Sequence, residues 1–339
     1  MHNNNDYQEA TCTHREFILL ESLLNARGQS VSCNSLAKLA GVSLTVLTKT
    51  LEKLNQQGFK IEVTQNNGYR LQEEPCTLHP ALVRYYQKKT TTKMEVLHFP
   101  TIDSTNDEAE RQYINGRKSP FAVTSSCQTQ GRGRLGRQWH SVSAENIYLS
   151  VLIEPNIPST KLQSFTLWSG IYICRILQKL TPETPLKIKW PNDLHCDGRK
   201  FAGMLTEAKM GSEGPHSLIF GIGINVNSNP LDYPGELSSS ATSLYAISGK
   251  EVSLNLLTVY VLQAILHAYE TCLSDEICET LTEAWAPLDA LNGRTVTVLY
   301  GNKTLSGIAD GIDASGALLL LQPDHTTLTV RAGEVTLKK

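Results

Sequence analysis

The sequence lacks the short spacings that identify metal sites and disulfide frameworks. None of its eight cysteines forms a C-x-x-C pair, and its nine histidines form no H-E-x-x-H motif. Zinc-finger, zinc-protease and disulfide-rich secreted classes are therefore excluded, and we expect no metal ligands, reduced thiols and a cytoplasmic location. His195 and Cys196 are interpreted as a turn after a strand. The dispersed thiols are Cys12, Cys33, Cys76, Cys127, Cys174, Cys196, Cys272 and Cys278.

The sequence also lacks a large excess of charge of either sign and long apolar runs. The 339 residues carry a net charge of −2, with 40% hydrophobic and 19% charged residues. This composition is typical of a globular protein, and any nucleic acid would have to bind a local basic patch. No signal peptide is expected, no apolar run is expected to span a membrane, and we predict no membrane partner. The length predicts two or three domains.

One loop dominates what the sequence does contain. Gly131–Arg137 holds three glycines and three arginines, and Trp139 follows it. Such a loop is either solvated or an anion cradle of backbone N–H groups and guanidinium groups, and we favour the cradle. The spacing G-x-G-x-x-G also suggests a dinucleotide fold, but residues 138–143 lack the helical spacing that this fold requires. The interpretation as an unstructured Arg/Gly segment that contacts nucleic acid has less support, because strand patterns flank the loop.

The first 73 residues predict a winged helix-turn-helix domain. Apolar spacing predicts helices over 14–27, 34–40 and 43–57, and an Asn66–Gly68 turn between short strands predicts the wing. We expect Leu36 and Leu39 to point inward, and one face of the third helix to carry Leu44, Leu47, Leu51 and Leu54.

The third helix is the candidate DNA-binding element. Residues 30–71 contain five basic and two acidic side chains, a local excess of about three positive charges. A helical module used only for packing or dimerisation remains the alternative. The predicted DNA-binding residues are Ser43, which also caps the helix, Thr45, Thr48, Lys49 and Lys53.

The rest of the chain divides by pattern into three parts. Residues 74–93 are predicted to be a linker with a short helix, 94–286 an α+β domain and 287–339 a small all-β domain. In the α+β domain the expected strands are 94–99, 121–125, 147–153, 186–190 and 218–224, and the expected helices are 105–114, 162–180 and 255–272.

Three further motifs lie in the α+β domain. Ile102–Asn106 is at a strand-to-helix junction, where helix capping by Asp103 or Ser104 is the plain interpretation. Lys187–Asp193 ends a strand, with its lysines on one face. Gly221–Asn227 is a strand whose glycines admit a close approach by backbone or ligand.

These motifs together resemble one family. The combination G-R-G-R-x-G-R-x-W with K-W-P-N-D, and the later Trp285–Asp289, is similar to bifunctional biotin–protein ligases that also repress the biotin operon. The resemblance covers essentially the whole chain. It implies an α+β fold with a winged helix-turn-helix, a central mixed-sheet domain like that of class II aminoacyl-tRNA synthetases, and a C-terminal SH3-like β-barrel.

The resemblance also implies an activity and partners. The family activates biotin with ATP and Mg²⁺ to biotinyl-5′-AMP, then transfers biotin to a lysine of the biotin carboxyl carrier protein of acetyl-CoA carboxylase. It implies a homodimer that forms with biotinyl-AMP and binds operator DNA. Two alternatives stay open: a repressor that senses the adenylate without catalysis, and a lipoate-type ligase.

Site residues follow from the matched motifs. Lys189 and Arg134 are the implied catalytic residues. The implied biotin-binding residues are Ser104, Thr105, Asn106, Gln128, Arg132, Gly133, Arg134 and Lys189. The implied adenylate-binding residues are Gly131, Arg137, Trp139, Asn225 and Lys200. Leu135 departs from the fuller arginine loop of some relatives.

Overall fold

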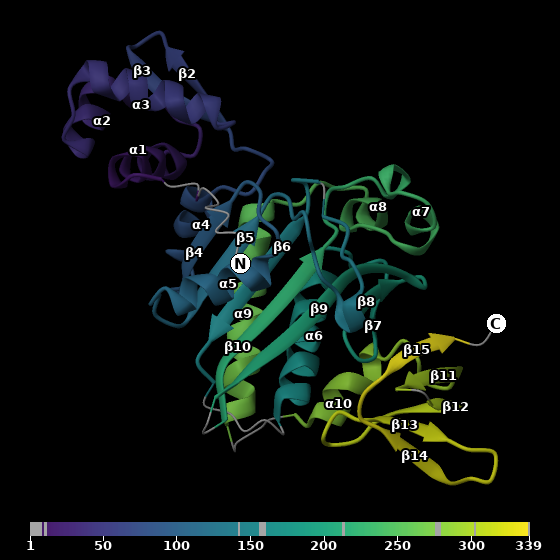
Figure 1. Cartoon of the computed structure of the whole chain (residues 1–339). Helices are drawn as coiled ribbons and strands as arrows, with labels where there is room; N and C mark the ends of the chain where they lie inside the picture. The colour runs from purple at the N-terminus through teal and green to yellow at the C-terminus, as the bar shows by residue number, and fades with distance from the viewer. Residues whose placement is uncertain are drawn as a thin grey trace.

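The chain folds into three consecutive units in the computed structural model, which describes residues 9, 12–141, 143–155, 161–211, 214–274, 279–301 and 303–337 (Figure 1). The N-terminal helical unit projects from one end of a central sheet, and a small β unit lies on another side of it. The seven cysteines among these residues are free thiols, and Cys278 lies outside the described residues.

The N-terminal unit is a helix-turn-helix with a β wing, as predicted. Its helices are α1 (His14–Asn25), α2 (Cys33–Ala40) and α3 (Leu44–Gln56), and its strands are β1 (Val31–Ser32), β2 (Lys60–Thr64) and β3 (Gly68–Glu73). Thr13 and Glu16 form a capping box at α1, and Ser43 caps α3 by accepting from the Val46 N–H at 3.4 Å. These local bonds fix where each helix begins.

Two of the predicted inward residues in this unit are wrong. Leu39 is 57% exposed and Leu44 is 51% exposed. In α2 the buried positions are Leu36, Ala37 and Ala40, so Leu39 falls on the opposite side of the helix. Leu44 is the first residue of α3, before the helix reaches the core around Leu47.

A seven-stranded mixed sheet forms the central unit, with strand order β4-β5-β6-β10-β9-β8-β7. Its first pair, β4 and β5, is parallel, and the remaining pairs are antiparallel. The strands are β4 (Glu95–Phe99), β5 (Phe121–Ser125), β6 (Ile147–Ile153), β7 (Leu186–Lys189), β8 (Asp193–Cys196), β9 (Arg199–Gly211) and β10 (Gly214–Ile224). His195 and Cys196 therefore belong to strand β8, and their interpretation as a turn was wrong.

The two faces of this sheet are covered differently. Helices α6 (Leu162–Gln178) and α9 (Leu254–Leu273) share one large core with the first face. The shorter α5 (Thr105–Ile114) packs on the second face through Ala109, over Val123, Leu152 and Ile219. Because α5 covers only part of the second face, the remainder is left for a site.

Helix α9 corrects the expectation about apolar runs. It is 20 residues long and apolar enough to cross a membrane by length and composition, and half of the tested window is buried in the protein. A helix that is hydrophobic around its circumference is typical of the core of a large domain. Within the described residues it is the one helix that passes this test.

Residues 74–93 contain α4 (Pro80–Gln87), which contacts both neighbouring units. Ala81, Leu82 and Tyr85 pack into the core of the N-terminal unit. Val83 packs with Leu78 against Val259 of α9. The helix therefore shares apolar cores with both units.

The C-terminal unit is an antiparallel sheet with strand order β14-β13-β12-β11-β15. Short helices α7 (Leu237–Ser240), α8 (Leu244–Ser248) and α10 (Leu281–Trp285) precede it. The strands are β11 (Thr295–Tyr300), β12 (Lys303–Ile312), β13 (Leu318–Leu321), β14 (Thr327–Val330) and β15 (Glu334–Leu337). Trp190 of the central unit donates its indole N–H to the Gly316 carbonyl at 3.0 Å, which ties the two units together.

Candidate functional site

A cavity of about 330 Å³ lies where strands β9 and β10 carry glycine. Gly203 and Gly223 are cross-strand partners, and Gly221 pairs with Leu205 one step further along the same face. These glycines leave the sheet surface without side chains there, so a hollow remains beside α5. The structure shows a close approach at Gly221 and Gly223 by the side chains of Asn106 and Trp139, whereas approach by a ligand stays a prediction.

Trp139 occupies part of this hollow. A Cβ at Gly223 would lie 2.4 Å from Cε2 of the Trp139 ring, and one at Gly203 would lie 2.9 Å from its Cζ3. The Lys200 ammonium is 5.2 Å from the centre of the indole ring and 2.7 Å from Asp193 Oδ1. The paired glycines, the lysine and the indole thus form a wall on which a flat ring can stack.

The arginine loop folds back on itself beside this wall. The Gly133 N–H donates to the Arg137 carbonyl at 2.7 Å, and the Trp139 N–H donates to the Gly131 carbonyl at 2.8 Å. Gly131 lies against the Trp139 backbone, where a Cβ would approach the carbonyl oxygen to 2.6 Å. Glycine is needed at position 131 because any side chain would collide with the returning strand of the loop.

Each arginine of the loop reaches a different part of the molecule. Arg132 pairs with Asp107 of α5 and Glu207 of β9. Arg134 donates to the Asn192 side-chain oxygen at 3.2 Å, and Arg137 pairs with Glu334 of the C-terminal unit. The loop is therefore held by ion pairs and hydrogen bonds around the cavity.

Asn192 explains the chemistry of the K-W-P-N-D motif. The side-chain N–H of Asn192 donates to the Met204 backbone carbonyl at 2.6 Å, and the backbone carbonyl of Asn192 accepts from the Met204 N–H at 3.0 Å. These bonds lock the amide so that its oxygen faces Arg134. The position of Asn192 in the sequence motif alone does not reveal this role.

Two of the cationic side chains that line the cavity are partly desolvated. Burial lowers the pKa of Lys189, with Asp193 acting in the opposite direction and Lys200 adding to the decrease. Burial also lowers the pKa of Arg134. A cation in such surroundings interacts strongly with an anion, because little water competes with it.

A chain of polar groups forms the cavity floor. The Gln128 side-chain oxygen accepts from the Thr105 N–H at 2.8 Å and lies 3.1 Å from the Thr105 hydroxyl. The Ser150 hydroxyl lies 2.7 Å from Thr105 Oγ1 and 2.5 Å from Asn106 Oδ1. These side chains are buried and mutually oriented, so the floor presents fixed polar atoms to a ligand.

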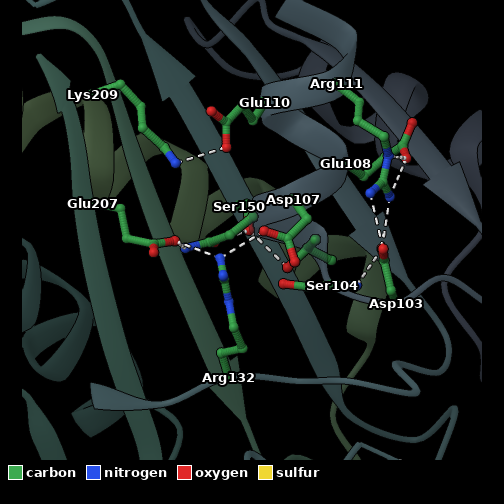
Figure 2. A network of polar contacts seen from close by, with 12 residues as sticks. Asp103, Ser104, Asp107, Glu108, Glu110, Arg111, Arg132, Ser150, Glu207 and Lys209 are labelled. Atoms are coloured by element: carbon green, nitrogen blue, oxygen red, sulfur yellow. Dashed lines mark hydrogen bonds and ion pairs between the residues drawn. The ribbon is translucent and has the colours of Figure 1, made fainter. Parts of the chain in front are cut away.

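Ser104 is the exception in this floor. It is the N-cap residue of α5, but its side chain makes no capping hydrogen bond. Its N–H instead donates to Asp103 Oδ1 at 2.7 Å, and Arg111 holds that carboxylate (Figure 2). The Asp103 carboxylate is thus bonded to the Ser104 N–H and to Arg111. The Ser104 side chain lies beside the cavity.

The structure brings nearly all implied ligase residues together. Gly131 lies behind the cavity wall, and Asn225 is held by donating its side-chain N–H to the Thr242 carbonyl at 3.0 Å. The predicted residues that line the cavity are Ser104, Thr105, Asn106, Gln128, Arg132, Gly133, Arg134, Arg137, Trp139, Lys189, Lys200 and Asn225.

Sequence reasoning missed other lining residues. Tyr233 and Leu237 come from the segment after β10, and Glu334 comes from the C-terminal unit. None carries a local motif, so only the tertiary fold reveals them. Within the described residues, no group of three or more His, Cys, Asp or Glu side chains could hold a metal ion.

The predicted DNA-binding residues lie apart from the cavity, on or beside α3. Ser43, Thr45, Thr48 and Lys49 are exposed. Lys53 is different, because its ammonium lies 2.5 Å from the carboxylate of Glu16, which is buried at the start of α1. The structure therefore gives Lys53 a contact within the domain, where we had expected a free surface charge.

Other basic residues of this unit are also paired. Arg70 pairs with Glu62, and Lys60 pairs with Glu73. Among the five basic residues of 30–71, Lys38 and Lys49 are the two without an ion-pair partner in the described part of the chain. The positive surface available to DNA is smaller than the local charge suggests.

Comparison with known proteins identifies the whole arrangement. Residues 98–225 match the Biotin/lipoate A/B protein ligase family, 292–338 match the Biotin protein ligase C terminal domain, and 15–70 match an HTH domain. The chain is 31% identical to the Bifunctional ligase/repressor BirA of Bacillus subtilis over 308 residues, which cover 89% of this chain and 92% of that protein. The chain belongs to the family of bifunctional biotin ligases and repressors.

Further relatives agree with this assignment. The BirA protein of Escherichia coli K12 is 30% identical over 326 residues, covering 93% of this chain and 95% of that protein. A solved biotin protein ligase from Aquifex aeolicus, in complex with biotin and ATP, superposes with a TM-score of 0.61 at 29% identity. The superposition covers 72% of this chain and 99% of the Aquifex chain.

Proposed function

We propose that this protein is an ATP-dependent biotin–protein ligase that forms biotinyl-5′-AMP and transfers biotin to a lysine of a biotin carboxyl carrier protein. The observation that carries the proposal is one cavity in which a polar floor, two cations and an aromatic wall meet. The floor of Thr105 and Gln128 suits a ureido group, which both donates and accepts hydrogen bonds. The Trp139 wall suits adenine.

Lys189 and Arg134 carry the first step. The biotin carboxylate attacks the α-phosphorus of ATP, and pyrophosphate leaves with the electrons of the broken P–O bond. Two anions repel as they approach, and negative charge develops on the leaving group. Cations that are already in place lower this barrier, because little reorganisation is needed during the step. The reaction needs no protein nucleophile.

The second step transfers the acyl group. The acceptor amine attacks the biotinyl carbonyl, AMP leaves, and the amine loses a proton. The mixed anhydride must be shielded from water until the acceptor arrives, and the arginine loop over the cavity serves this purpose. Gly131, Gly133, Arg132 and Arg137 shape that loop, while Asn225 and Lys200 hold the adenylate side.

Mg²⁺ enters as part of the MgATP substrate. Its preferred ligands are oxygens, and the described residues contain no preformed cluster of acidic ligands, which suits an ion carried by nucleotide phosphates and water. The carboxylates that line the cavity, Asp193 and Glu334, are already paired with Lys200 and Arg137.

The second function is repression of biotin synthesis genes in the presence of biotinyl-AMP. A helix-turn-helix at residues 15–70 and bifunctional relatives support it. Because few free cations lie near α3, one copy would bind DNA weakly, and an adenylate-stabilised homodimer would double the contacts. Ser43, Thr45, Thr48 and Lys49 are the proposed DNA-facing residues.

Finer structural and cellular assignments belong to the same proposal. We assign residues 1–73, 74–93, 94–286 and 287–339 as DNA-binding domain, linker, ligase domain and SH3-like domain. The central sheet is proposed to share the architecture of class II aminoacyl-tRNA synthetases. The location is proposed to be the cytoplasm.

Mixing the protein with biotin and MgATP tests the ligase. We expect pyrophosphate release and a bound product with the mass of biotinyl-AMP. Adenylate formation with lipoate in place of biotin would indicate a lipoate-type ligase. A protein that binds added biotinyl-AMP but releases no pyrophosphate from biotin and MgATP would be a non-catalytic repressor. A salt titration of binding to the biotin-operon control region, with and without biotinyl-AMP, tests repression. Equal affinity in both conditions would remove the repressor half and leave the ligase half intact.

A further inference from the structure

An ion-pair network at the edge of the cavity joins the arginine loop to two different elements (Figure 2). The Arg132 guanidinium lies 2.8 Å from Asp107 Oδ1 of α5 and 2.9 Å from Glu207 Oε2 of β9. Its charge is therefore already balanced by protein carboxylates. In this arrangement Arg132 braces the loop, whereas Arg134 and Lys189 face the cavity and have no ion-pair partner among the described residues.

Glu207 does more than pair with Arg132. The same oxygen, Oε2, accepts a hydrogen bond from the Asn106 side-chain N–H at 2.6 Å. This bond fixes the Asn106 amide with its nitrogen toward β9, so its oxygen receives the Ser150 hydroxyl at 2.5 Å. A Cβ at Gly221 would lie 2.3 Å from that amide oxygen, so the amide is pressed onto strand β10.

The other end of the loop is tied to the same set of groups. From Ser150, polar contacts continue through Thr105 to Gln128. The Gln128 side-chain N–H donates to the Ser141 hydroxyl at 2.9 Å, and that hydroxyl donates to the Trp139 carbonyl at 3.2 Å. One continuous polar chain thus connects Arg132, at the start of the loop, with Trp139, at its end.

We propose that Glu207 is a positioning residue that couples closure of the arginine loop to the orientation of the cavity floor. Glu207 is not among the residues that line the cavity, so it acts through Asn106 and Arg132. Asn106 is 5% exposed, and a buried amide with a wrong orientation leaves donors and acceptors unmatched. Removing the carboxylate therefore loosens the loop and lets the floor amide rotate.

The competing explanation is an ordinary surface ion pair. Arg132 is 42% and Glu207 29% exposed, and pairs at such positions usually contribute little. The chain contains a matched control for this explanation. Glu110 of α5 and Lys209 of β9 join the same two elements at 2.9 Å, without touching the loop or the floor. A generic effect of linking α5 to β9 would appear in both pairs.

Trypsin reads loop closure directly, because it cleaves after arginine and the loop contains Arg132, Arg134 and Arg137. The full-length protein, its Glu207→Gln variant and the control Glu110→Gln are digested without ligands, and mass spectrometry measures cuts within 131–138. We expect Glu207→Gln to be cut about fivefold to tenfold faster than the parent, and Glu110→Gln at the parental rate. Equal rates for Glu207→Gln and the parent would overturn the proposal, as would equal acceleration in both variants.

Asp107→Asn provides a second variant should Glu207→Gln fail to fold. It removes the other carboxylate from Arg132 and leaves the Asn106 bond in place. We expect about threefold faster cleavage of the loop. Parental cleavage in Asp107→Asn would contradict the brace.

A kinetic arm rests on the proposed function and tests the floor. In the biotin-dependent release of pyrophosphate, we expect Glu207→Gln to raise KM for biotin about tenfold and to change kcat less than about threefold. Arg132→Ala should raise KM by itself and leave a smaller further effect for Glu207→Gln, because Glu207 then acts only through its bond to Asn106. A fall in kcat at unchanged KM, or additive effects, would contradict the coupling. Absence of adenylation in the parent protein would overturn the proposed function, while the trypsin result still decides the brace.

Discussion

The backbone N–H of His79 donates a 2.7 Å hydrogen bond to the side-chain oxygen of Asn255, joining the start of α4 to the first turn of α9. Asn255 is 1% exposed and also donates to the Thr77 carbonyl at 3.1 Å. The His79 ring reaches the other way, with Nε2 3.3 Å from the side-chain oxygen of Gln57, the C-cap residue of α3. One imidazole therefore lies between the candidate DNA-binding helix and the ligase unit.

This position predicts acid sensitivity. The His79 Nδ1 accepts from the Ala81 N–H at 3.2 Å, so the neutral ring must carry its proton on Nε2. Burial lowers the pKa of His79 to about 4 from 6.5. Between these values the unfolded chain binds a proton that the folded chain does not, so stability falls as the pH falls from 6.5 toward 4.

Denaturant unfolding at pH 7 and pH 4.5 measures this loss. Because the ring is partly exposed, we expect its contribution to be about 1–2 kcal/mol. His79→Gln should lose that much less stability than the parent over the same interval. His325→Asn, at an exposed turn, serves as the control and should behave like the parent. An identical pH dependence in His79→Gln would show that this ring does not titrate during unfolding.

Lys189→Ala should raise the activation free energy of adenylation by about 3 kcal/mol, the cost of removing one preorganised charge-stabilising group. The matched control is Lys187→Ala, because Lys187 lies on the same face of the same strand. Its ammonium donates to the Pro287 carbonyl at 2.7 Å. Pyrophosphate release in single turnover measures both. A folded Lys189→Ala protein with parental adenylation would remove this lysine from the catalytic step.

Gly223→Ala should displace the Trp139 ring. The new methyl would meet that ring at 2.4 Å, which requires the indole to move. We expect weaker ATP binding by about tenfold and a loss of about 1–3 kcal/mol of stability. In a Trp139→Ala background the same glycine change should cost almost no stability, because the colliding ring is gone. A persistent cost there would place the collision elsewhere.

Lys49→Ala and Lys53→Ala should differ, although both lysines are on the predicted DNA-binding helix. Lys49 is exposed, so its loss should weaken operator binding and reduce the salt dependence by about one contact. Lys53 pairs with the buried Glu16, so its loss should destabilise the N-terminal unit by about 1 kcal/mol. Salt titrations of operator binding and denaturant unfolding separate the two effects. Similar DNA-binding losses with unchanged stability would make both lysines phosphate contacts.

Much of the fold was predictable because its signals are local. Strands β5 and β6 and helix α5 have the predicted bounds. Strands β8 and β9 were not predicted, because polar and charged residues, such as His195 in β8 and Arg199 and Lys200 in β9, break up their apolar pattern. The N-cap role of Ser43 was visible in the sequence and is confirmed.

The site was predictable only as a set of residues. Motif similarity indicated which side chains belong together, and most of them line one cavity. It could not show that Trp139 lies on two paired glycines or that Arg132 is neutralised by carboxylates from α5 and β9. Those relationships depend on strand register and on contacts between residues far apart in the chain, which no local pattern encodes.

The contact between Arg137 and Glu334 also concerns the order of synthesis. Glu334 and Val335 line the cavity, yet they are added to the chain almost 200 residues after the arginine loop (197 separate Arg137 from Glu334). While translation is under way, the folded ligase sheet therefore has a cavity that is open on one side. Strand β15 must leave the ribosome before Arg137 of the loop can pair with Glu334. Biotin activation by a chain that is still being translated is therefore expected to be inefficient.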